Sequence, residues 1–459
     1  MQAPRDLPAL SPLRRAAGRL HFTLRALGVV QLVALAGLAL SALAIRMVPG
    51  RESRQLRLAR RVAATFGRLR GPFAKLGQYA ALRVDGVAPE ARAALEPLRD
   101  HVPPLAFHWI RSQIEAELGA PLSILYREFD PTPLGAASVA QVHAALLPDG
   151  RPVAVKVQYP WLARSLPVDL ALVRLGIRAS AGSAAAHAPW LAEFASGLAE
   201  ELDFVREAAL AREIAANLSD EARVVVPRVI ESHSTARVLT MERLPTVPLA
   251  ALDARGIPRR PVLETIVRAY ARQIFEDGLF HADPHPGNLF VIDEPEAKHS
   301  PRVLFVDFGL CKRLDPALAR ELRQGILALL RRDLDGFVAG MVRIGAVAPG
   351  AEPRVRAAVA SVFARLANET ASPLALSGAG VLALKDEAKR LLYETPGLAL
   401  PSDLLLYAKT LSYLFALARE LAPDVDPMPL TVPWLLRFLA VRDAAPTTSA
   451  SAAAAPGVG

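Results

Sequence analysis

The pattern of apolar and polar residues first marks a long uncharged run near the start of the chain. The 20 residues from Ala26 to Ile45 carry no charge and lie between Arg25 and Arg46. This length and these flanks predict a helix that crosses a bilayer, and we place it over residues 26–48. More arginines follow the run than precede it, which favours a cytoplasmic main body. A buried core helix stays an alternative, and so does a signal peptide, because Ala42-Leu43-Ala44 fits a cleavage site.

Beyond this run the pattern changes twice. Residues 51–82 are basic and helical in pattern, and further helices are predicted at 89–96 and 109–118. Short runs rich in β-branched residues then follow at 138–147, 151–158, 222–230 and 236–244, which predicts strands. After residue 244 the pattern is helical again, except for two strand-like runs at 288–293 and 302–308. A small sheet, a two-stranded element and a helical lobe in this order predict an α+β, protein-kinase-like bilobal fold.

Composition and charge narrow the function. Hydrophobic residues make up 52% of the 459 residues and charged residues 22%, which excludes a mainly disordered chain. The single cysteine, Cys311, excludes an internal disulfide and a cysteine-based zinc cluster. The net charge of +9 indicates anionic partners such as nucleotide phosphates, nucleic acid or an acidic membrane surface. Only seven of the cationic side chains are lysines, and two of them, Lys75 and Lys156, fall in motifs.

The strongest chemical signal is the segment HADPHPGNLFVID at residues 281–293, which is followed by Asp307-Phe308-Gly309. Asp283 and Asn288 are five residues apart, as in the catalytic loop of kinases. Asn288 and Asp307 offer the hard oxygen ligands that Mg²⁺ prefers when it neutralises ATP phosphates. Asp283 lies where it can orient or deprotonate a nucleophile. Alternatively, the aspartates and the asparagine are ordinary residues of a proline- and glycine-rich turn.

Two upstream segments fit the same site. Lys156 lies inside the apolar run VAVKVQ, where a lysine is costly unless it is paired or points into a polar cleft. A surface lysine on an edge strand is the other interpretation. The loop Gly135-Ala136-Ala137-Ser138 stands where a kinase has its glycine-rich loop, but it contains one glycine. Its backbone N–H groups can still hold phosphate, although alanine restricts positive φ.

Together these motifs resemble the UbiB/AarF/ADCK family of atypical kinase-like proteins, which is linked to prenyl-quinone metabolism. The resemblance covers residues 51–427. It rests on KLGQ (Lys75 to Gln78), GAAS (residues 135–138), AVK, EELDFVREA (residues 200–208), HADPHPGN and DFG. Gly135 replaces the first alanine of the commonest form of the loop. No Ala-Pro-Glu sequence follows DFG, and the catalytic loop lacks the arginine of protein kinases.

The resemblance also implies roles for individual residues. Glu207 resembles the helix glutamate that pairs with Lys156, and both would position the α- and β-phosphates. Glu242 would meet the adenine at a kinase-like hinge, with a plain surface glutamate as the alternative. The extension with Lys75 and Gln78 would fold over the cleft as a regulatory segment. The acidic pair Glu201 and Asp203 would hold Lys75 there, because a buried ammonium needs carboxylate partners; otherwise the pair belongs to a solvated helix face.

The expected protein is therefore an atypical kinase or ATPase at the inner membrane that uses ATP and Mg²⁺. It would support ubiquinone biosynthesis by hydrolysing ATP or by transferring phosphate to a small or lipid substrate. Expected partners are membrane lipids, prenyl-quinone intermediates and other quinone-biosynthesis proteins, and no nucleic acid. A protein serine/threonine kinase and a non-catalytic nucleotide-gated scaffold stay open as alternatives. The predicted regions are a basic tail (1–25), the membrane helix (26–48), the extension (49–130), an N-lobe (131–243), a C-lobe (244–442) and a disordered tail (443–459).

Overall fold

The computed structural model describes residues 20–47, 49–76, 93–94, 102–181, 184–369, 380, 387–388, 390–392 and 394–441. Most of the predicted basic tail, Gln78 and the predicted disordered tail lie outside these residues. The chain forms two compact units. The first contains residues 1–265 and 281–311, and the second contains residues 266–280 and 312–459. The predicted lobe boundary at residue 244 stays a prediction.

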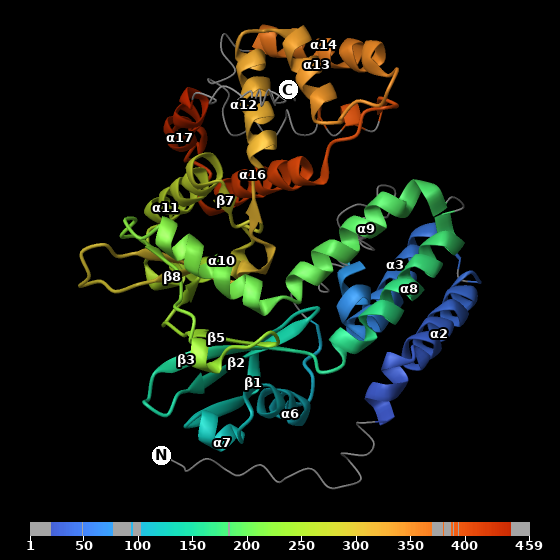
Figure 1. The fold of residues 1–459 in the computed structure, drawn as a ribbon, viewed down its shortest axis with the longest axis vertical. Helices are drawn as coiled ribbons and strands as arrows, with labels where there is room; N and C mark the ends of the chain where they lie inside the picture. The colour runs from blue at the N-terminus through green and yellow to red at the C-terminus, as the bar shows by residue number, and fades with distance from the viewer. Residues whose placement is uncertain are drawn as a thin grey trace, which may run out of the picture. The chain divides into compact units, whose positions relative to one another are not determined.

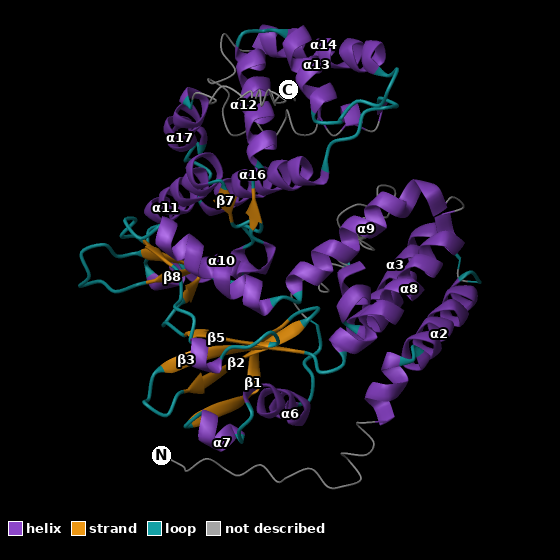
Figure 2. Cartoon of the chain, viewed as in Figure 1, coloured by secondary structure: helices purple, strands orange, loops and turns teal. Residues whose placement is uncertain are grey.

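The first unit contains an antiparallel four-stranded sheet in the order β1-β2-β3-β5 (Figures 1 and 2). Its strands are β1 (Glu128–Ala136), β2 (Ala140–Leu146), β3 (Pro152–Gln158) and β5 (Val238–Glu242). The last three confirm the strands predicted within 138–147, 151–158 and 236–244. The side chains of β2 and β3 alternate between more and less buried positions, as expected of strands with one face toward the core.

Strand β1 has no counterpart among the predictions, and its prolines explain why. Pro131 and Pro133 lie within the strand, and proline cannot donate a ladder hydrogen bond. The structure accommodates them because β1 is an edge strand of this sheet, with register shifts on both sides of Pro133. The strand ends at the loop that carries Ala137 and Ser138, so the edge position also places this loop.

A second small sheet supports the predicted catalytic segments. It has the order β4-β9-β8-β6, with β4 (Val224–Val225), β6 (Val247–Pro248), β8 (Leu289–Ile292) and β9 (Arg302–Phe305). Strands β8 and β9 pair antiparallel and confirm the two strand-like runs. The run 222–230 contributes only the two residues of β4 and an isolated bridge at Val229, because Pro227 interrupts it. Short 3-10 turns lie at Glu231–His233, Leu249–Ala251 and Asp253–Arg255.

Helices of the first unit pack beside and against the larger sheet (Figure 1). They are α2 (Val29–Ile45), α3 (Arg51–Leu69), α6 (Phe107–Leu118), α7 (Leu122–Leu125), α8 (Leu162–Ala181), α9 (Ala184–Glu201) and α10 (Phe204–Asn217). A shared apolar core of Leu69, Phe73, Val173 and Phe194 joins the extension to α8 and α9. The extension is thus part of the first unit rather than a separate domain.

The uncharged run near the start of the chain is not one straight helix. Within the described residues, no single helix meets the length and hydropathy of a membrane span. The helices Leu20–Ala26 and Val29–Ile45, which are bent by 70° relative to each other, together have the length and composition of a membrane span. The bend lies at Gly28, whose φ of +76° suits glycine and where a Cβ would stand 2.6 Å from Val168 Cγ1 on α8.

Buried polar groups explain why this bend forms. Arg25 and Gln31 are buried although their neighbours are apolar. Gln31 donates to the Arg25 carbonyl at 2.9 Å and to Asp169 Oδ1 on α8 at 2.6 Å, while the Arg25 guanidinium donates to the Leu69 carbonyl. The base of the apolar pair is therefore attached to the rest of the first unit by hydrogen bonds. The prediction of an uninterrupted span over residues 26–48 is corrected accordingly.

The second unit is mainly helical. Helix α11 (Arg259–Arg272) enters it and continues as a π-helical turn, Gln273–Asp277. The two-stranded pair β7 (Leu279–Phe280) and β10 (Lys312–Arg313) follows, with α12 (Pro316–Leu330), α13 (Leu334–Arg343), α14 (Glu352–Glu369), α16 (Ser402–Leu421) and α17 (Met428–Ala440). Apolar side chains of α13 and α14 share a core in this unit. This helical content agrees with the pattern predicted after residue 244.

Candidate nucleotide-binding site

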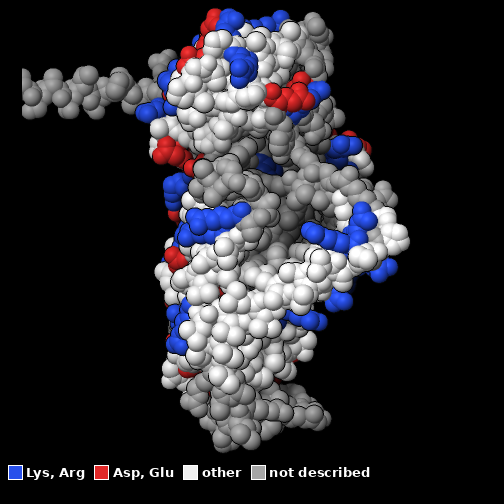
Figure 3. Space-filling model, turned by 90° about the vertical axis from the view of Figure 1, so that its right-hand side faces the viewer, with Lys and Arg blue, Asp and Glu red and all other residues white. Residues whose placement is uncertain are grey.

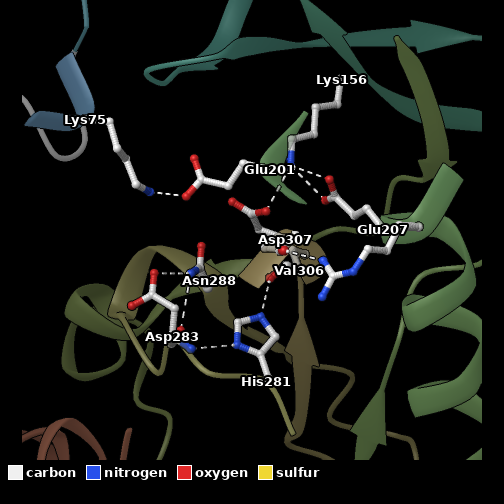
Figure 4. Close-up of polar contacts among 11 residues, drawn as sticks. Lys75, Lys156, Glu201, Glu207, His281, Asp283, Asn288, Val306 and Asp307 are labelled. Carbon is white, nitrogen blue, oxygen red and sulfur yellow. Dashed lines mark hydrogen bonds and ion pairs between the residues drawn. The ribbon is translucent and has the colours of Figure 1, made fainter. Parts of the chain in front are cut away.

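Lys156, Glu207 and Asp307 meet in one ion-pair group (Figure 4). Lys156 Nζ, on the central strand β3, lies 2.7 and 2.9 Å from the two carboxylate oxygens of Glu207 on α10. The same ammonium lies 2.9 Å from Asp307 Oδ1, in the turn that follows β9. Elements that are far apart in the sequence thus bring three predicted site residues together, and Lys156 is not the isolated surface lysine of the alternative interpretation.

The electrostatics of this group follow from unequal burial. The Glu207 side chain is 1% exposed, that of Lys156 18% and that of Asp307 50%. Burial raises the pKa of Glu207 to about 7, although the attraction of Lys156 opposes this. Burial also disfavours charge on the other two groups, but the ion pair outweighs it. The pKa of Asp307 falls to about 2, and that of Lys156 rises above its ordinary value.

This raised pKa predicts a pH dependence of stability. The folded chain binds the Glu207 proton more tightly than a carboxyl of ordinary pKa 4.5. This tighter proton binding adds to the free energy of unfolding. The contribution is fully present below pH 4.5 and is lost as the pH rises through about 7. We expect the melting temperature of the nucleotide-free wild type to fall between pH 6 and 8 more than that of Glu207→Gln. Differential scanning calorimetry at several pH values measures both slopes, and equal slopes would contradict the raised pKa.

The segment 281–288 is held against the strand that leads to Asp307. His281 contacts the Val306 carbonyl through Nε2 at 3.0 Å, and the Asp283 N–H donates to His281 Nδ1 at 3.4 Å. The Val306 N–H donates to the Asn288 carbonyl at 3.0 Å. Asn288 Nδ2 donates to Asp283 Oδ2 at 3.0 Å, so the loop also holds its two functional side chains together. Figure 4 shows these side chains in one group with Asp307.

Asn288 and Asp307 fit a hard cation. Both hydrogen bonds of the Asn288 side chain use its amide nitrogen, and among the described residues its amide oxygen accepts none. Asp307 is half exposed and carries a negative charge at neutral pH. It has a φ of +63° and directly precedes the turn Phe308–Leu310. One amide oxygen and one carboxylate leave the remaining positions of Mg²⁺ to phosphates and water, as this ion prefers.

Of the predicted loop at residues 135–138, Gly135 and Ala136 are the last two residues of strand β1, and Ala137 and Ser138 lie in the turn that leads to β2. Gly135 and Ala137 are exposed, Ala136 is half-buried and Ser138 is buried. A Cβ on Gly135 would meet open space, so the local packing does not require glycine there. Glu242 ends β5 half-buried, and its N–H donates to the Arg228 carbonyl at 2.8 Å. These positions are compatible with the roles that the sequence suggested, and those roles stay predictions.

The extension reaches the same region through Lys75, which pairs with Glu201 at the end of α9 (Figure 4). Their side chains are only 14% and 10% exposed, so the contact is largely shielded from water. Asp203, the predicted second partner, is exposed and accepts a hydrogen bond from the Arg206 N–H at 2.9 Å, which caps α10. Gln78 lies outside the described residues.

Arg206 is a site residue that the sequence did not single out. Its guanidinium donates to the Gly309 carbonyl at 3.1 Å and to the Cys311 carbonyl at 3.0 Å, and it lies 3.3 Å from Glu200. It therefore ties α9 and α10 to the turn that carries Asp307. The sequence offers one indication of this role, which is that Arg206 lies three residues after Asp203 and directly before Glu207. The chain has 47 arginines, so the residue type alone does not distinguish it.

Comparisons with known proteins identify the family to which this fold belongs. A family model described as the ABC1 atypical kinase-like domain matches residues 97–340. A Marinobacter nauticus protein named "Probable protein kinase UbiB" is 34% identical over 378 residues, which cover 80% of this chain and 67% of that protein. The "Uncharacterized protein sll1770" of Synechocystis is 31% identical over 402 residues, or 84% and 66% of the two chains.

Among solved structures, Rv3197 from Mycobacterium tuberculosis, determined in complex with erythromycin, has a TM-score of 0.45 and 24% identity and covers 78% of this chain and 93% of its own. The matched family model includes the loop at 135–138, Lys156, Glu207 and the segments around Asp283 and Asp307. The chain therefore belongs to the family of ABC1 atypical kinase-like proteins, whose curated members include those named UbiB.

Proposed function

We propose that this protein binds MgATP at the Lys156–Glu207–Asp307 group and hydrolyses it or transfers its γ-phosphate to a small or lipid substrate. The observation that carries the proposal is the position of Lys156, which bonds to both a buried and a half-exposed carboxylate. A lysine fixed in this way presents a point charge to phosphates, and Asp307 and Asn288 offer oxygen ligands for the metal. Mg²⁺ would neutralise phosphate charge when it is bound.

The residues of the catalytic loop fit a proton-transfer role. Asp283 is half-buried, and Asn288 Nδ2 donates to one of its carboxylate oxygens, Oδ2, as well as to its carbonyl. This arrangement orients the carboxylate toward a bound nucleophile, either water or a substrate hydroxyl. Relatives named UbiB support a role in prenyl-quinone biosynthesis. This role and the lipid nature of the substrate are part of the proposal.

Surface chemistry supports membrane association. Leu32, Val33, Leu40 and Leu43 on α2 are between 52% and 70% exposed, which is unusual for large apolar side chains on one helix. The neighbouring α3 exposes Arg57, Arg60, Arg61 and Arg68. Figure 3 shows blue Lys and Arg side chains among a broad uncharged surface on this side of the molecule. An apolar helix next to exposed arginines fits a bilayer that contains anionic lipid.

Protein kinase activity is a second candidate, because the curated relatives carry that name. The contact between Lys75 and Glu201 weighs against it. It ties the extension to α9, and α9 packs against the Phe308–Leu310 turn. A protein substrate would have to reach Asp283 past a segment that this largely buried pair holds in place. A nucleotide-gated scaffold would use the same ligands without turnover.

One assay separates these candidates. The purified protein is incubated with γ-labelled ATP and Mg²⁺ in neutral or anionic phospholipid vesicles, with and without a quinone analogue. Free labelled phosphate that requires Asp283 supports hydrolysis, and label in the lipid fraction supports lipid phosphotransfer. Label mainly in protein would favour a protein kinase. Nucleotide binding without any labelled product would overturn the proposed catalysis and leave the scaffold.

A prediction about regulation follows from Lys75. In Lys75→Ala the shielded carboxylate of Glu201 loses its ammonium partner, which we expect to cost about 1–3 kcal/mol of stability. Loosening of the extension would then open the site to protein, so autophosphorylation should increase while the native lipid-linked function is lost. Lys75→Arg should also lose the native function, because the planar guanidinium group does not replace the compact charge of the ammonium group.

The matched control is Lys312→Ala, which removes a half-buried lysine from the second unit. Thermal unfolding and labelled ATP measure the two effects separately. Wild-type autophosphorylation and wild-type quinone complementation in both Lys75 variants would show that the Lys75–Glu201 contact has no regulatory role.

A further inference from the structure

Hydrogen bonds hold the loop that stands in place of a glycine-rich loop. Each of its four successive carbonyls, from Ala136 to Val139, accepts one bond. The carbonyl of Ala136 accepts from the Val102 N–H at 3.3 Å, and that of Ser138 accepts from the Gly71 N–H at 2.7 Å. Tyr159 supplies the other two bonds. Its hydroxyl donates to the Ala137 carbonyl at 2.9 Å, and its N–H donates to the Val139 carbonyl at 3.1 Å.

These bonds fix the direction of the N–H groups as well. A peptide unit is planar and trans, so its carbonyl and the next N–H point in opposite directions. The bond from the Tyr159 hydroxyl to Ala137 thereby sets the direction of the Ser138 N–H. The bond from Gly71 to Ser138 sets that of the Val139 N–H. Among the described residues, neither of these two N–H groups donates to a protein acceptor.

Tyr159 is itself held rigidly. It is 1% exposed, and the Arg70 guanidinium lies 4.9 Å from the centre of its ring. Trp161 stacks against it at 5.7 Å with 8° between the ring planes. The Arg70 side chain also donates to the Pro103 carbonyl at 2.6 Å, so the extension holds the guanidinium that lies against the tyrosine ring. Its hydroxyl therefore has a defined position before any ligand binds, which is the condition for preorganised binding.

Gly71 is the matching contact from the extension. Its φ of +53° is readily adopted only by glycine, and a Cβ there would lie 2.5 Å from Leu162 Cδ1. This close approach places its N–H at the Ser138 carbonyl. The extension is thus not only attached near the site through Lys75. It also contributes a direct contact to the loop.

We infer that Tyr159 is a positioning residue for phosphate binding, which acts with the Gly71 N–H to aim the Ser138 and Val139 amides at the nucleotide phosphates. This inference rests on the proposed binding of ATP. An alanine-rich loop has little freedom to adapt to a ligand. The hydrogen bonds to the Ala137 and Ser138 carbonyls instead hold the Ser138 and Val139 N–H groups in fixed directions before a ligand binds. Tyr159 does not touch the nucleotide, and it acts through the Ala137 carbonyl.

The test compares Tyr159→Phe with Tyr126→Phe. Tyr126 is a matched control because it is also buried and its hydroxyl lies 3.3 Å from the Thr240 hydroxyl, away from the loop. Burial raises the pKa of both tyrosines to about 12, so both keep their proton at neutral pH. Isothermal titration calorimetry gives the affinities of the full-length protein for MgATP, MgADP and adenosine. Thermal unfolding confirms that each variant is folded.

We expect Tyr159→Phe to bind MgATP and MgADP about three- to tenfold more weakly, with unchanged adenosine affinity. Tyr126→Phe should match the wild type for all three ligands. Equal MgADP affinity in Tyr159→Phe and the wild type would overturn the inference. An equal loss for adenosine and MgADP would also overturn it, because the hydroxyl would then serve the fold in general. A wild type that binds no MgATP would instead refute the proposed function.

Discussion

Asp307→Asn is expected to abolish the thermal stabilisation that MgATP gives the wild type. A ligand present at 100 times its Kd stabilises the folded state by about 2.7 kcal/mol, which is a readily measured shift. The neutral amide is a far poorer ligand for Mg²⁺ than the carboxylate, and it also loses the charge pair with Lys156. A thermal-shift titration with and without Mg²⁺ measures the effect.

Asp149→Asn is the control for this experiment. Asp149 is exposed in the turn between β2 and β3, and within the described part of the chain its carboxylate pairs only with Arg151, at 2.7 Å. Its MgATP shift should equal that of the wild type. If MgATP stabilises Asp307→Asn as much as it stabilises the wild type, Asp307 is not part of the site. The proposed position of the metal would then be wrong as well.

Lys156→Met is expected to weaken nucleotide binding by at least about tenfold while the protein stays folded at neutral pH. Methionine fills a similar volume, but the phosphates lose a charged hydrogen-bond donor, and such bonds are about twice as strong as neutral ones. Folding should tolerate the change because the buried Glu207, whose pKa is already about 7, takes up a proton when its partner is removed. Calorimetric titration with MgADP and thermal unfolding near pH 6.5 measure both effects.

A second consequence distinguishes this variant from a general loss of structure. Without the ammonium, the pKa of Glu207 rises further, so its stabilising contribution is lost at higher pH and the unfolding temperature should fall steeply above pH 7. Lys312→Met should show neither effect. Unchanged MgADP affinity in Lys156→Met would contradict the proposed role of Lys156.

The sequence predicted those parts of the fold that depend on local pattern. Strands β2, β3 and β5 follow from β-branched runs, and Asp283, Asn288 and Asp307 follow from their spacing. Strand β1 was not predicted because Pro131 and Pro133 are acceptable only on an edge, and the position of a strand in a sheet is a property of the tertiary structure.

The contacts that the sequence did not predict are long-range. The bend at Gly28 depends on the close approach of α8 and on Asp169, which lies 138 residues after Gln31. The bond from Tyr159 to Ala137 and the bonds from Arg206 to the DFG turn join ordinary residue types with no motif of their own. Residue spacing singled out the groups that we propose to contact a nucleotide. The groups that position them became visible only in three dimensions.

The most direct test of the central claim is an experimental structure of the protein with Mg²⁺ and a non-hydrolysable ATP analogue. We predict that the α- and β-phosphates lie within hydrogen-bond distance of Lys156 Nζ and the Ser138 and Val139 amides, with the metal on Asn288 and Asp307. A nucleotide bound elsewhere, or a metal that contacts neither Asn288 nor Asp307, would contradict the account.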